Sequence, residues 1–583
     1  MVRILTLLVA LILLPHGICF VSADMVVWSE NSLTKIQPAT PVKPRPSAIY
    51  LSAARNEYEP FQVVVRSIGG ALRGVDVDLS DFHGGRGAKI SCRENCTIYR
   101  ELYIRVTTPT GPYGSIGEWP DPLIPKIDRY AGERRNAFPF DVPQDRNQPI
   151  WVDVYVPADA SPGEYTASLK VQAKAEPTIH IPVQLTVRSF VLPATSSIKT
   201  AFLLWGGALP VLHGSEFSGE PLDQLVRLYS SALLLHRLSN GWLLGGQDWQ
   251  PTELVRANTD DLQKLHANLT PFFDGSITSS GGKVTAVVPP SLMCLGGSYP
   301  RETPAFPYVN FSGAFCRPDV IDFLRLAGWL ERLAFYLPDE PNLADPKVLG
   351  EVNSLVDLFR QRGLRTLITG CGAGATVPNA DVWVVPVPVL HQAFQDGTFA
   401  STYGQKQSAR GEVWVYQACF THSAACGGQQ WYPGSPGWPD YMIDMQGMKN
   451  RIQDWINWRL GVQGELYWGV NGAYYEGDPL QTPYFGYGNG EGNFFYPGTP
   501  ARIGGSSHIP IESIRLKLKR EGLEDYEYLA LLARLGDRSY ADVKAAQIAT
   551  SAIEWDQDPD HLYSVRSQIS DRIESLLSGR STP

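Results

Sequence analysis

The pattern of apolar residues changes near residue 195, and this change limits the possible folds more than any other feature of the chain. Before it, short apolar–polar alternations such as Trp151–Val156 are separated by Gly, Pro and Asp, a pattern typical of half-buried strands. After it, apolar runs of strand length alternate with segments of helical period. The sequence therefore predicts an all-β domain followed by an α/β domain.

Residues 24–195 are predicted to form an N-terminal β-sandwich domain. Turn residues, as in Asp159–Gly163, separate strands whose number and spacing are typical of this fold. Surface aromatic residues leave a sugar-binding role open, but no cluster of titratable residues indicates chemistry, so a structural module is favoured. The predicted strands are Ala48–Leu51, Phe61–Arg66, Val75–Leu79, Ile98–Val106, Ile150–Val156, Tyr165–Val171 and Ile179–Phe190.

Residues 196–510 are predicted to form a (β/α)8 TIM-like barrel, because strand segments alternate with helices such as Pro221–Arg237 and Asp345–Gln361. A Gly- and Tyr-rich loop, Gly469–Pro510, follows the last strand. Residues 511–583 are predicted to be a C-terminal helical extension packed on the barrel. The strand segments are Ile198–Trp205, Gly241–Leu244, Val284–Val288, Leu333–Leu337, Thr366–Thr369, Val382–Val387, Val413–Gln417 and Glu465–Trp468.

Residues 1–23 have the pattern of a signal peptide: Arg3, an apolar run over Ile4–Leu14, and small residues at Val21–Ala23. An uncleaved membrane anchor is the alternative, but the run is shorter than the ~20 residues that span a bilayer. We therefore expect cleavage after Ala23 and a secreted or periplasmic protein. No later segment reaches membrane-spanning length. The net charge of −9 argues against nucleic acid as a partner.

Export makes disulfides possible, and the chain has 8 cysteines, of which Cys19 lies in the predicted signal peptide. The predicted pairs are Cys92 with Cys96 and Cys419 with Cys426, because each pair is close in sequence. Cys294 and Cys316 form a weaker pair, which would leave Cys371 free. No repeated CxxC spacing indicates a zinc site, and no metal or cofactor is predicted.

The fourth predicted strand runs directly into two adjacent carboxylates, Asp339 and Glu340, flanked by Pro338 and Pro341. In a barrel, active sites lie at the carboxyl ends of the strands. Two carboxylates in different surroundings suit glycosidic bond cleavage, in which one is a proton donor and the other stays anionic. The alternative is a solvated acidic turn, or a cap for the helix that begins near Asp345.

Aromatic and polar residues follow the other predicted strands and would converge on the same end of the barrel. Flat rings with polar neighbours suit a sugar, whose C–H faces stack while its hydroxyls form hydrogen bonds. Packing inside the barrel is the alternative, and it is favoured for Trp414 and Tyr467. Motifs for serine hydrolases, zinc proteases and phosphate-binding loops are absent from the sequence. The predicted substrate-binding residues are Trp205, Tyr416, Trp468, Asn471, Tyr475 and Glu476.

Several segments resemble glycoside hydrolase family 123 over nearly the whole mature chain. Asn56–Val65 and Pro162–Tyr165 are similar to its sandwich domain, and Tyr336–Pro341 is similar to its catalytic Asp-Glu-Pro segment. Asn493–Gly498 and Arg520–Leu529 are similar to its C-terminal signatures, of which Arg520–Leu529 is the most specific. The resemblance implies a retaining β-N-acetylgalactosaminidase whose nucleophile is the 2-acetamido group of the substrate.

By the same resemblance, Glu340 is the general acid/base, and Asp339 orients the acetamido group and stabilises the oxazolinium-like intermediate. The chain departs from the family at Glu491, between Gly490 and Gly492, where the family pattern has Asp. This difference affects the expected sugar more than the expected chemistry. Glu524 and Asp525 of the C-terminal signature are predicted to be structural.

The sequence thus leads to three hypotheses. The first is an exported exo-β-N-acetylhexosaminidase, with N-acetylgalactosamine as the favoured sugar. The second is a glycosidase for a sugar without an acetamido group. The third is a non-catalytic glycan-binding protein on the same scaffold. Each takes a carbohydrate as its partner and needs no cofactor, and the sequence does not determine the oligomeric state.

Overall fold

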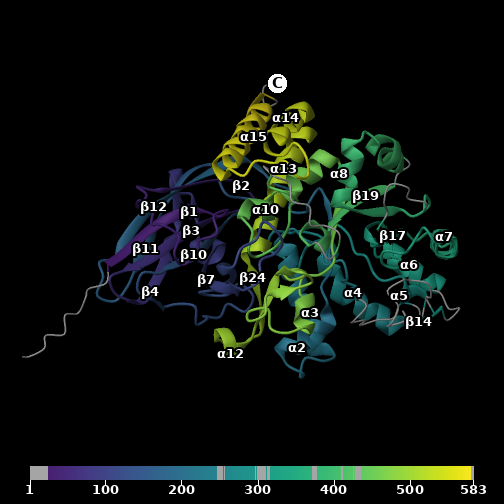
Figure 1. Ribbon diagram of the computed structural model, residues 1–583, viewed down its shortest axis with the longest axis horizontal. Coiled ribbons are helices and arrows are strands. Elements are labelled where there is room, and N and C mark those ends of the chain that lie inside the picture. Colours follow the sequence, from purple (N-terminus) through teal and green to yellow (C-terminus); the bar gives the residue numbers. More distant parts are fainter. Residues whose placement is uncertain are drawn as a thin grey trace, which may run out of the picture.

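The computed structural model describes residues 24–245, 254, 257–295, 297–298, 310–311, 316–370, 377–408, 411–423, 426 and 435–579. The predicted signal peptide and Cys371 lie outside these residues. Figure 1 shows an N-terminal β part at one side, an α/β part at the other, and C-terminal helices between and above them. Among the described residues, no helix combines the length and apolar character needed to cross a membrane.

The N-terminal part consists of two sheets that share one hydrophobic core, to which Val63 contributes from the first sheet and Val183 from the second. The first sheet has the order β1-β3-β10-β7-β8-β24-β23, and the second has β2-β12-β11-β4-β9. All the strands predicted for this part are present, as β2, β3, β4, β7, β10, β11 and β12. The bounds are β1 Asp24–Asn31, β2 Ile49–Arg55, β3 Glu57–Ile68, β4 Leu72–Leu79, β5 Phe82–Gly84, β6 Lys89–Ile90, β7 Cys96–Val106, β8 Gly117–Pro125, β9 Phe140–Val142, β10 Asn147–Val156, β11 Gly163–Gln172 and β12 Ile179–Val191.

Two strands of the first sheet come from the far end of the chain. β24 (Ile509–Ser513) pairs with β8 through Glu512 and Leu123, and β23 (Phe495–Gly498) pairs with β24. The stretch Gly469–Pro510, expected to be a loop, therefore contains regular structure, including the 3-10 helix η7 (Gly472–Tyr475) and the strand pair β21 (Tyr484–Phe485) and β22 (Gly488–Asn489). The limits of the domains remain a prediction.

The α/β part contains a parallel sheet of six strands in the order β13-β20-β19-β18-β17-β16. The predicted second and third barrel strands appear only as isolated parallel bridges. Near the second, Asn240 bridges to Phe202 of β13. Near the third, Val287 bridges to Leu333 and Pro290 bridges to Tyr336 of β16. A complete eight-stranded barrel is therefore not confirmed. Pro289 and Pro290 lack the N–H groups that a continuous ladder requires. The strands are β13 Lys199–Phe202, β16 Phe335–Tyr336, β17 Thr366–Thr369, β18 Val382–Pro386, β19 Glu412–Gln417 and β20 Gly464–Tyr467.

Alternate residues of these strands and of the bridged segments form one interior cluster. Leu203, Val288 and Tyr336 belong to it, together with Trp414 and Tyr416. Because the strands are parallel, their carboxyl ends lie at the same edge of the sheet. The residues that follow β13, β16, β17, β19 and β20 are thereby brought together.

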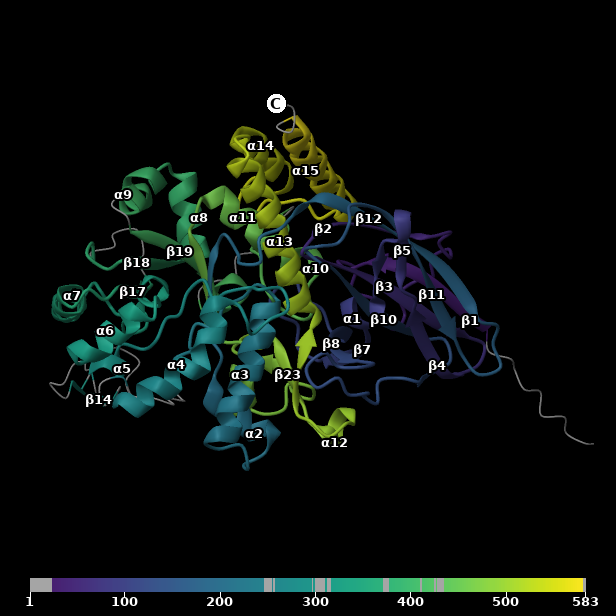
Figure 2. The ribbon, with the colours of Figure 1, turned by 180° about the vertical axis from the view of Figure 1, so that it is seen from behind.

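Helices α6, α7 and α8 cover this sheet on the side away from the N-terminal part, whereas α2, α3 and α10 lie nearer the middle of the molecule (Figures 1 and 2). Asn258 caps α4 by accepting a hydrogen bond from the Asp261 N–H, and Asp345 caps α7 by accepting one from Lys347. The helices are α2 Leu209–His213, α3 Glu220–Leu235, α4 Thr259–Asp274, α5 Leu292–Leu295, α6 Pro318–Leu326, α7 Pro346–Gln361, α8 Val387–Gln395, α9 Gln405–Ser408, α10 Gly447–Arg451 and α11 Gln453–Leu460, with α1 Cys92–Asn95 in the N-terminal part and α12 Pro500–Ile503 after β23.

The C-terminal extension consists of α13 (Ile514–Arg534), α14 (Arg538–Ile548) and α15 (Pro559–Gly579). Helix α13 lies between the two parts of the molecule, as both views show (Figures 1 and 2). It is rich in buried charges: Arg515 is paired with Asp121 at 2.9 Å, and Asp525 with Arg451 at 2.8 Å. The extension therefore contacts the N-terminal sheets as well as the α/β part. Glu524 and Asp525, which were predicted to be structural, are buried and paired with Arg237 and Arg451.

Candidate active site

A cavity of about 350 Å³ opens at the carboxyl ends of the parallel strands. It contains five of the residues predicted from the sequence: Trp205, Asp339, Glu340, Tyr416 and Trp468. Strands β13, β16, β19 and β20 bring these residues together from positions far apart in the chain. The predicted convergence of carboxylates and aromatic rings at one face is therefore present.

Asp339 is held in place by two hydroxyl groups. The Tyr336 hydroxyl donates a hydrogen bond of 2.6 Å to Oδ1 of Asp339, and the Thr369 hydroxyl donates one of 2.9 Å to the same oxygen. Oδ2 of Asp339 has no hydrogen-bond partner within the part of the chain that the structure describes. The arrangement fixes the carboxylate while leaving one oxygen available to a ligand.

Glu340 adopts a backbone conformation that non-glycine residues rarely adopt, with φ at 41°. Its N–H donates a 2.9 Å hydrogen bond to the Thr369 hydroxyl, which therefore contacts both acidic residues. Gly370 lies against the same turn, where a Cβ would come within 3.3 Å of Glu340 Cα. Strain of this kind costs on the order of 1–3 kcal/mol and is typical of functional sites. Here it places two consecutive side chains on the same side of the chain.

Glu340 and Asp339 have different electrostatic surroundings. Burial of the Glu340 carboxyl among the cavity residues raises its pKa; the hydrogen bond from the Tyr416 hydroxyl acts in the opposite direction, and the nearby charge of Asp339 raises it further. Both acidic residues still have solvent access at the mouth of the cavity. A glutamate with a raised pKa beside a fixed aspartate is the arrangement required for a proton donor and an anionic partner.

Three tryptophans form one wall of the cavity. The Trp205 ring lies 5.3 Å from that of Trp242 and 6.4 Å from that of Trp468, measured between ring centroids. The Trp205 indole N–H donates a 3.0 Å hydrogen bond to the Trp468 carbonyl oxygen. The ring orientations are therefore fixed by direct contact, which gives the cavity a rigid apolar surface.

Trp468 is connected to a buried ion pair. Its indole N–H donates a 2.8 Å hydrogen bond to Oε1 of Glu491, and Oε2 of Glu491 lies 2.6 Å from Nε2 of His422. Burial alone would lower the pKa of His422, but the Glu491 carboxylate outweighs this effect and the pKa is raised. Gly488 allows the approach, because a Cβ there would lie 2.9 Å from the His422 ring. The Glu491 side chain, which is longer than the aspartate expected at this position, thus reaches both Trp468 and His422.

The other predicted binding residues do not line the cavity. Asn471 is buried beneath it, where its side chain accepts a hydrogen bond from the Trp205 N–H and donates one to the Trp205 carbonyl oxygen. Tyr475 packs its ring 6.2 Å from that of Trp205 and is 44% exposed. Glu476 is exposed. Asn471 is therefore a support for the tryptophan wall, and Glu476 lies outside the site.

Several cavity residues were not predicted from the sequence as ligand contacts. Tyr336 lies inside the strand that precedes the acidic pair, and Thr369 is the last residue of β17. Thr369 could have been predicted to line the cavity, because it is a polar residue at the carboxyl end of β17, the strand next to β16. Trp242 and Tyr487 complete the lining from segments that are not strands.

The described part of the chain contains three disulfides: Cys92–Cys96, Cys294–Cys316 and Cys419–Cys426. Cys419 lines the cavity, so the third disulfide restrains the segment beyond Tyr416. Among the described residues there is no group of three or more His, Cys, Asp or Glu side chains that could hold a metal ion.

We expect Glu491→Ala to lower kcat/KM for a sugar substrate about tenfold, because it leaves the Trp468 indole N–H and His422 without their buried partner. Glu476→Ala is the matched control and should change kcat/KM less than twofold, because Glu476 is exposed and outside the cavity. Melting temperatures of both variants separate a local effect from unfolding. Equal effects of the two substitutions would contradict this assignment.

Two family models match the chain. The model for the glycoside hydrolase 123 N-terminal domain matches residues 34–173, and the model for the glycoside hydrolase 123 catalytic domain matches residues 305–532. Together these ranges cover more than half of the chain. Comparison with curated proteins gives no match.

A solved structure of a family 123 glycoside hydrolase from Clostridium perfringens, studied for glycolipid glycan hydrolysis, is similar to this chain with a TM-score of 0.64 and 13% identity. The match covers 95% of this chain and 98% of that chain, so the two share a fold over almost their whole length. A GH5 xyloglucanase from Bacteroides ovatus matches with a TM-score of 0.27 and 9% identity, over 82% of this chain and 98% of that one.

Proposed function

Because this chain belongs to glycoside hydrolase family 123, we propose that it is an exported retaining exo-glycosidase that releases a terminal N-acetyl-β-hexosamine, with N-acetylgalactosamine as the favoured sugar. One observation carries the proposal. Asp339 and Glu340 line the same cavity, one fixed by two hydroxyl groups and the other with a raised pKa.

In the first step, the carbonyl oxygen of the 2-acetamido group attacks the anomeric carbon. The bond from that carbon to the leaving oxygen breaks, and Glu340 transfers its proton to the leaving oxygen. The free Oδ2 of Asp339 accepts a hydrogen bond from the acetamido N–H, which orients the group and stabilises the positive charge of the oxazolinium ring. Tyr336 and Thr369 keep the Asp339 carboxylate in place during this step.

In the second step, water attacks the anomeric carbon from the side that the leaving group vacated. The Glu340 carboxylate accepts a proton from this water, and the oxazolinium ring opens to restore the acetamido group. Two inversions at the same carbon give net retention of configuration. Because the substrate supplies the nucleophile, the two acidic residues need not lie on opposite faces of the sugar, which fits their adjacency in the chain.

The tryptophan wall supports a sugar as the ligand. Trp205, Trp242 and Trp468 present flat apolar surface beside the acidic pair, and such surfaces stack on the C–H faces of a sugar ring. Export is proposed from the apolar run near the N-terminus, Ile4–Leu14. The substrate proposed is a glycan or glycoconjugate outside the cytoplasm.

The proposal predicts release of nitrophenol from nitrophenyl N-acetyl-β-galactosaminide and strong inhibition by a thiazoline analogue of the oxazolinium ring. Such an analogue mimics a species formed only with the acetamido group as nucleophile, so it should bind at least about 100-fold more tightly than the substrate. Inhibition constants in the native protein and in Asp339→Asn measure the effect, which should be largely lost in the variant. Turnover of the plain galactoside with no thiazoline inhibition would instead support a glycosidase that does not use the acetamido group.

A further inference from the structure

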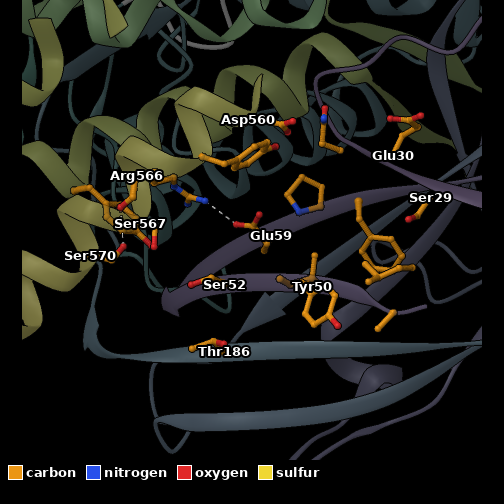
Figure 3. Close-up of a pocket in the computed structure, with 18 residues that line it drawn as sticks. Ser29, Glu30, Tyr50, Ser52, Glu59, Thr186, Asp560, Arg566, Ser567 and Ser570 are labelled. Atoms are coloured by element: carbon orange, nitrogen blue, oxygen red, sulfur yellow. Dashed lines mark hydrogen bonds and ion pairs between the residues drawn. The ribbon is translucent and has the colours of Figure 1, made fainter. Parts of the chain in front are cut away.

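A second cavity, of about 530 Å³, lies between the N-terminal sheets and helix α15. Its floor is formed by residues of β1, β2 and β3, and its wall by Asp560, Tyr563 and Arg566. Both Tyr50 and Arg566 line it, and Figure 3 shows the Arg566 guanidinium directed toward Glu59, with Tyr50 on the strand beyond Glu59. It is larger than the cavity with the acidic pair and shares no residue with it.

Tyr50 is an exposed aromatic residue that lines this cavity. It is 70% exposed, more than any other aromatic side chain among the described residues, although its neighbours Ile49 and Leu51 are buried. This alternation along β2 turns the ring away from the sandwich core. Ser52 is two residues further on and faces the same side, and Thr186 lies opposite it on β12. An exposed ring beside hydroxyl groups is thus fixed on a rigid strand.

The charged groups of this cavity are held in place before any ligand arrives. Glu59 pairs with Nη1 of Arg566 at 2.8 Å, and Glu30 pairs with Lys43 at 2.7 Å. Arg566 also contacts Glu57 and Asp525, so its charge is balanced within the protein. The Ser29, Ser567 and Ser570 hydroxyls complete the polar lining.

The polar and aromatic lining of this cavity suits a neutral polyol better than an ion. An anion would meet the carboxyl groups of Glu30 and Asp560, whereas the cation Arg566 is already engaged by acidic side chains of the protein. Across the described residues, no group of three or more potential ligands could hold a metal ion. A purely apolar ligand would exclude water from this polar lining without contributing a hydrogen bond of its own. A sugar ring satisfies both surfaces, because its C–H face can stack on Tyr50 while its hydroxyls bond to the fixed polar groups.

We propose that the cavity between Tyr50 and helix α15 is a second, non-catalytic carbohydrate-binding site. The ligand of this site is a sugar unit of a glycan. The proposal of a second site rests on the proposed function only for the choice of glycans as ligands. The site would hold one part of a large glycan or glycoconjugate while the terminal sugar occupies the cavity with the acidic pair.

The test uses the full chain carrying Glu340→Gln, titrated with galactose, lactose and N-acetylgalactosamine and followed by saturation-transfer NMR. Adding Tyr50→Ala should weaken binding of at least one of these sugars about tenfold, whereas Tyr50→Phe, which keeps the ring, should stay within twofold. In the otherwise native chain, Tyr50→Ala should change kcat/KM for the nitrophenyl substrate less than twofold. Tyr50 is largely exposed, so the melting temperature should not fall.

The two proposals fail in different ways. Binding that depends on Tyr50, together with no hydrolysis of any nitrophenyl sugar, would overturn the catalytic proposal and leave the second site standing. Hydrolysis without any binding that responds to Tyr50→Ala would overturn the second site alone. A loss of binding in Tyr50→Phe equal to that in Tyr50→Ala would also contradict it, because the stacking surface is unchanged in the Phe variant.

Discussion

Replacing Glu340 with Gln is expected to lower kcat by about 10²–10⁴-fold, the range typical of losing a positioned general acid/base. The amide has the same shape as the carboxyl group but cannot transfer a proton to the leaving oxygen. The loss should be larger for a disaccharide than for the nitrophenyl substrate, because nitrophenolate leaves readily without protonation. Initial rates on both substrates measure the difference.

The dependence of kcat on pH distinguishes the loss of proton transfer in Glu340→Gln from a change in the shape of the cavity. Glu340 must be protonated to act as the acid, so activity in the native protein should fall as pH rises through its pKa. Burial raises that pKa, which shifts the alkaline limb of the profile above the range of an ordinary glutamate. The limb should disappear in Glu340→Gln. Glu331→Gln, an exposed glutamate just before the same strand, is the matched control and should leave rates and profile unchanged. Persistence of the limb in Glu340→Gln would assign it to another group.

Replacing Arg520 with Met should lower the free energy of unfolding by about 3–5 kcal/mol, because it removes one partner of a fully buried ion pair. Arg520 on α13 donates hydrogen bonds of 3.0 and 3.2 Å to Asp153 of β10, and its guanidinium lies 4.1 Å from the Tyr58 ring centroid. Methionine fills similar space but leaves Asp153 with Lys517 as its remaining cation. Urea denaturation followed by fluorescence measures the change.

The matched control for Arg520→Met is Arg538→Met. Arg538 forms a surface pair with Asp542 at 3.7 Å, and such pairs contribute about 0–1 kcal/mol. The double variant Arg520→Met/Asp153→Asn should recover part of the stability lost in Arg520→Met, because it also removes the buried carboxylate that has lost one of its two cations. Equal destabilisation by Arg520→Met and Arg538→Met would show that the α13 contacts are not an important source of stability.

Short-range pattern in the sequence was sufficient to predict many strands of the N-terminal part, but not β8 or the two strands that come from the far end of the chain. The alternation in Ile150–Val156 and Tyr165–Val171 predicted β10 and β11 within a few residues. Strand β8 (Gly117–Pro125) was missed because Pro120, Pro122 and Pro125 argue against a strand, and it is stabilised by pairing with β7 and β24. The pairing of β24 with β8 spans almost 400 residues, so no local signal indicates it.

The acidic pair could be predicted because an apolar strand ended in two carboxylates between prolines. Their different surroundings depend on Tyr336, Thr369 and Tyr416, which approach from three strands and are not adjacent in sequence. Asn471 was assigned to the ligand because it follows β20, whereas it bonds to the Trp205 backbone instead. Sequence position predicts which end of a strand a residue occupies, but the direction of its side chain depends on packing.

The return of β23 and β24 to the first sheet has a consequence for how this chain can be divided. A fragment starting near residue 196 would carry both strands without β8, leaving an unpaired backbone edge that favours aggregation. The complementary fragment would lack the last two strands of its sheet and every contact with α13. Neither half is a transplantable module, so gene fusions and domain exchanges that keep the protein intact should not divide the chain near residue 196.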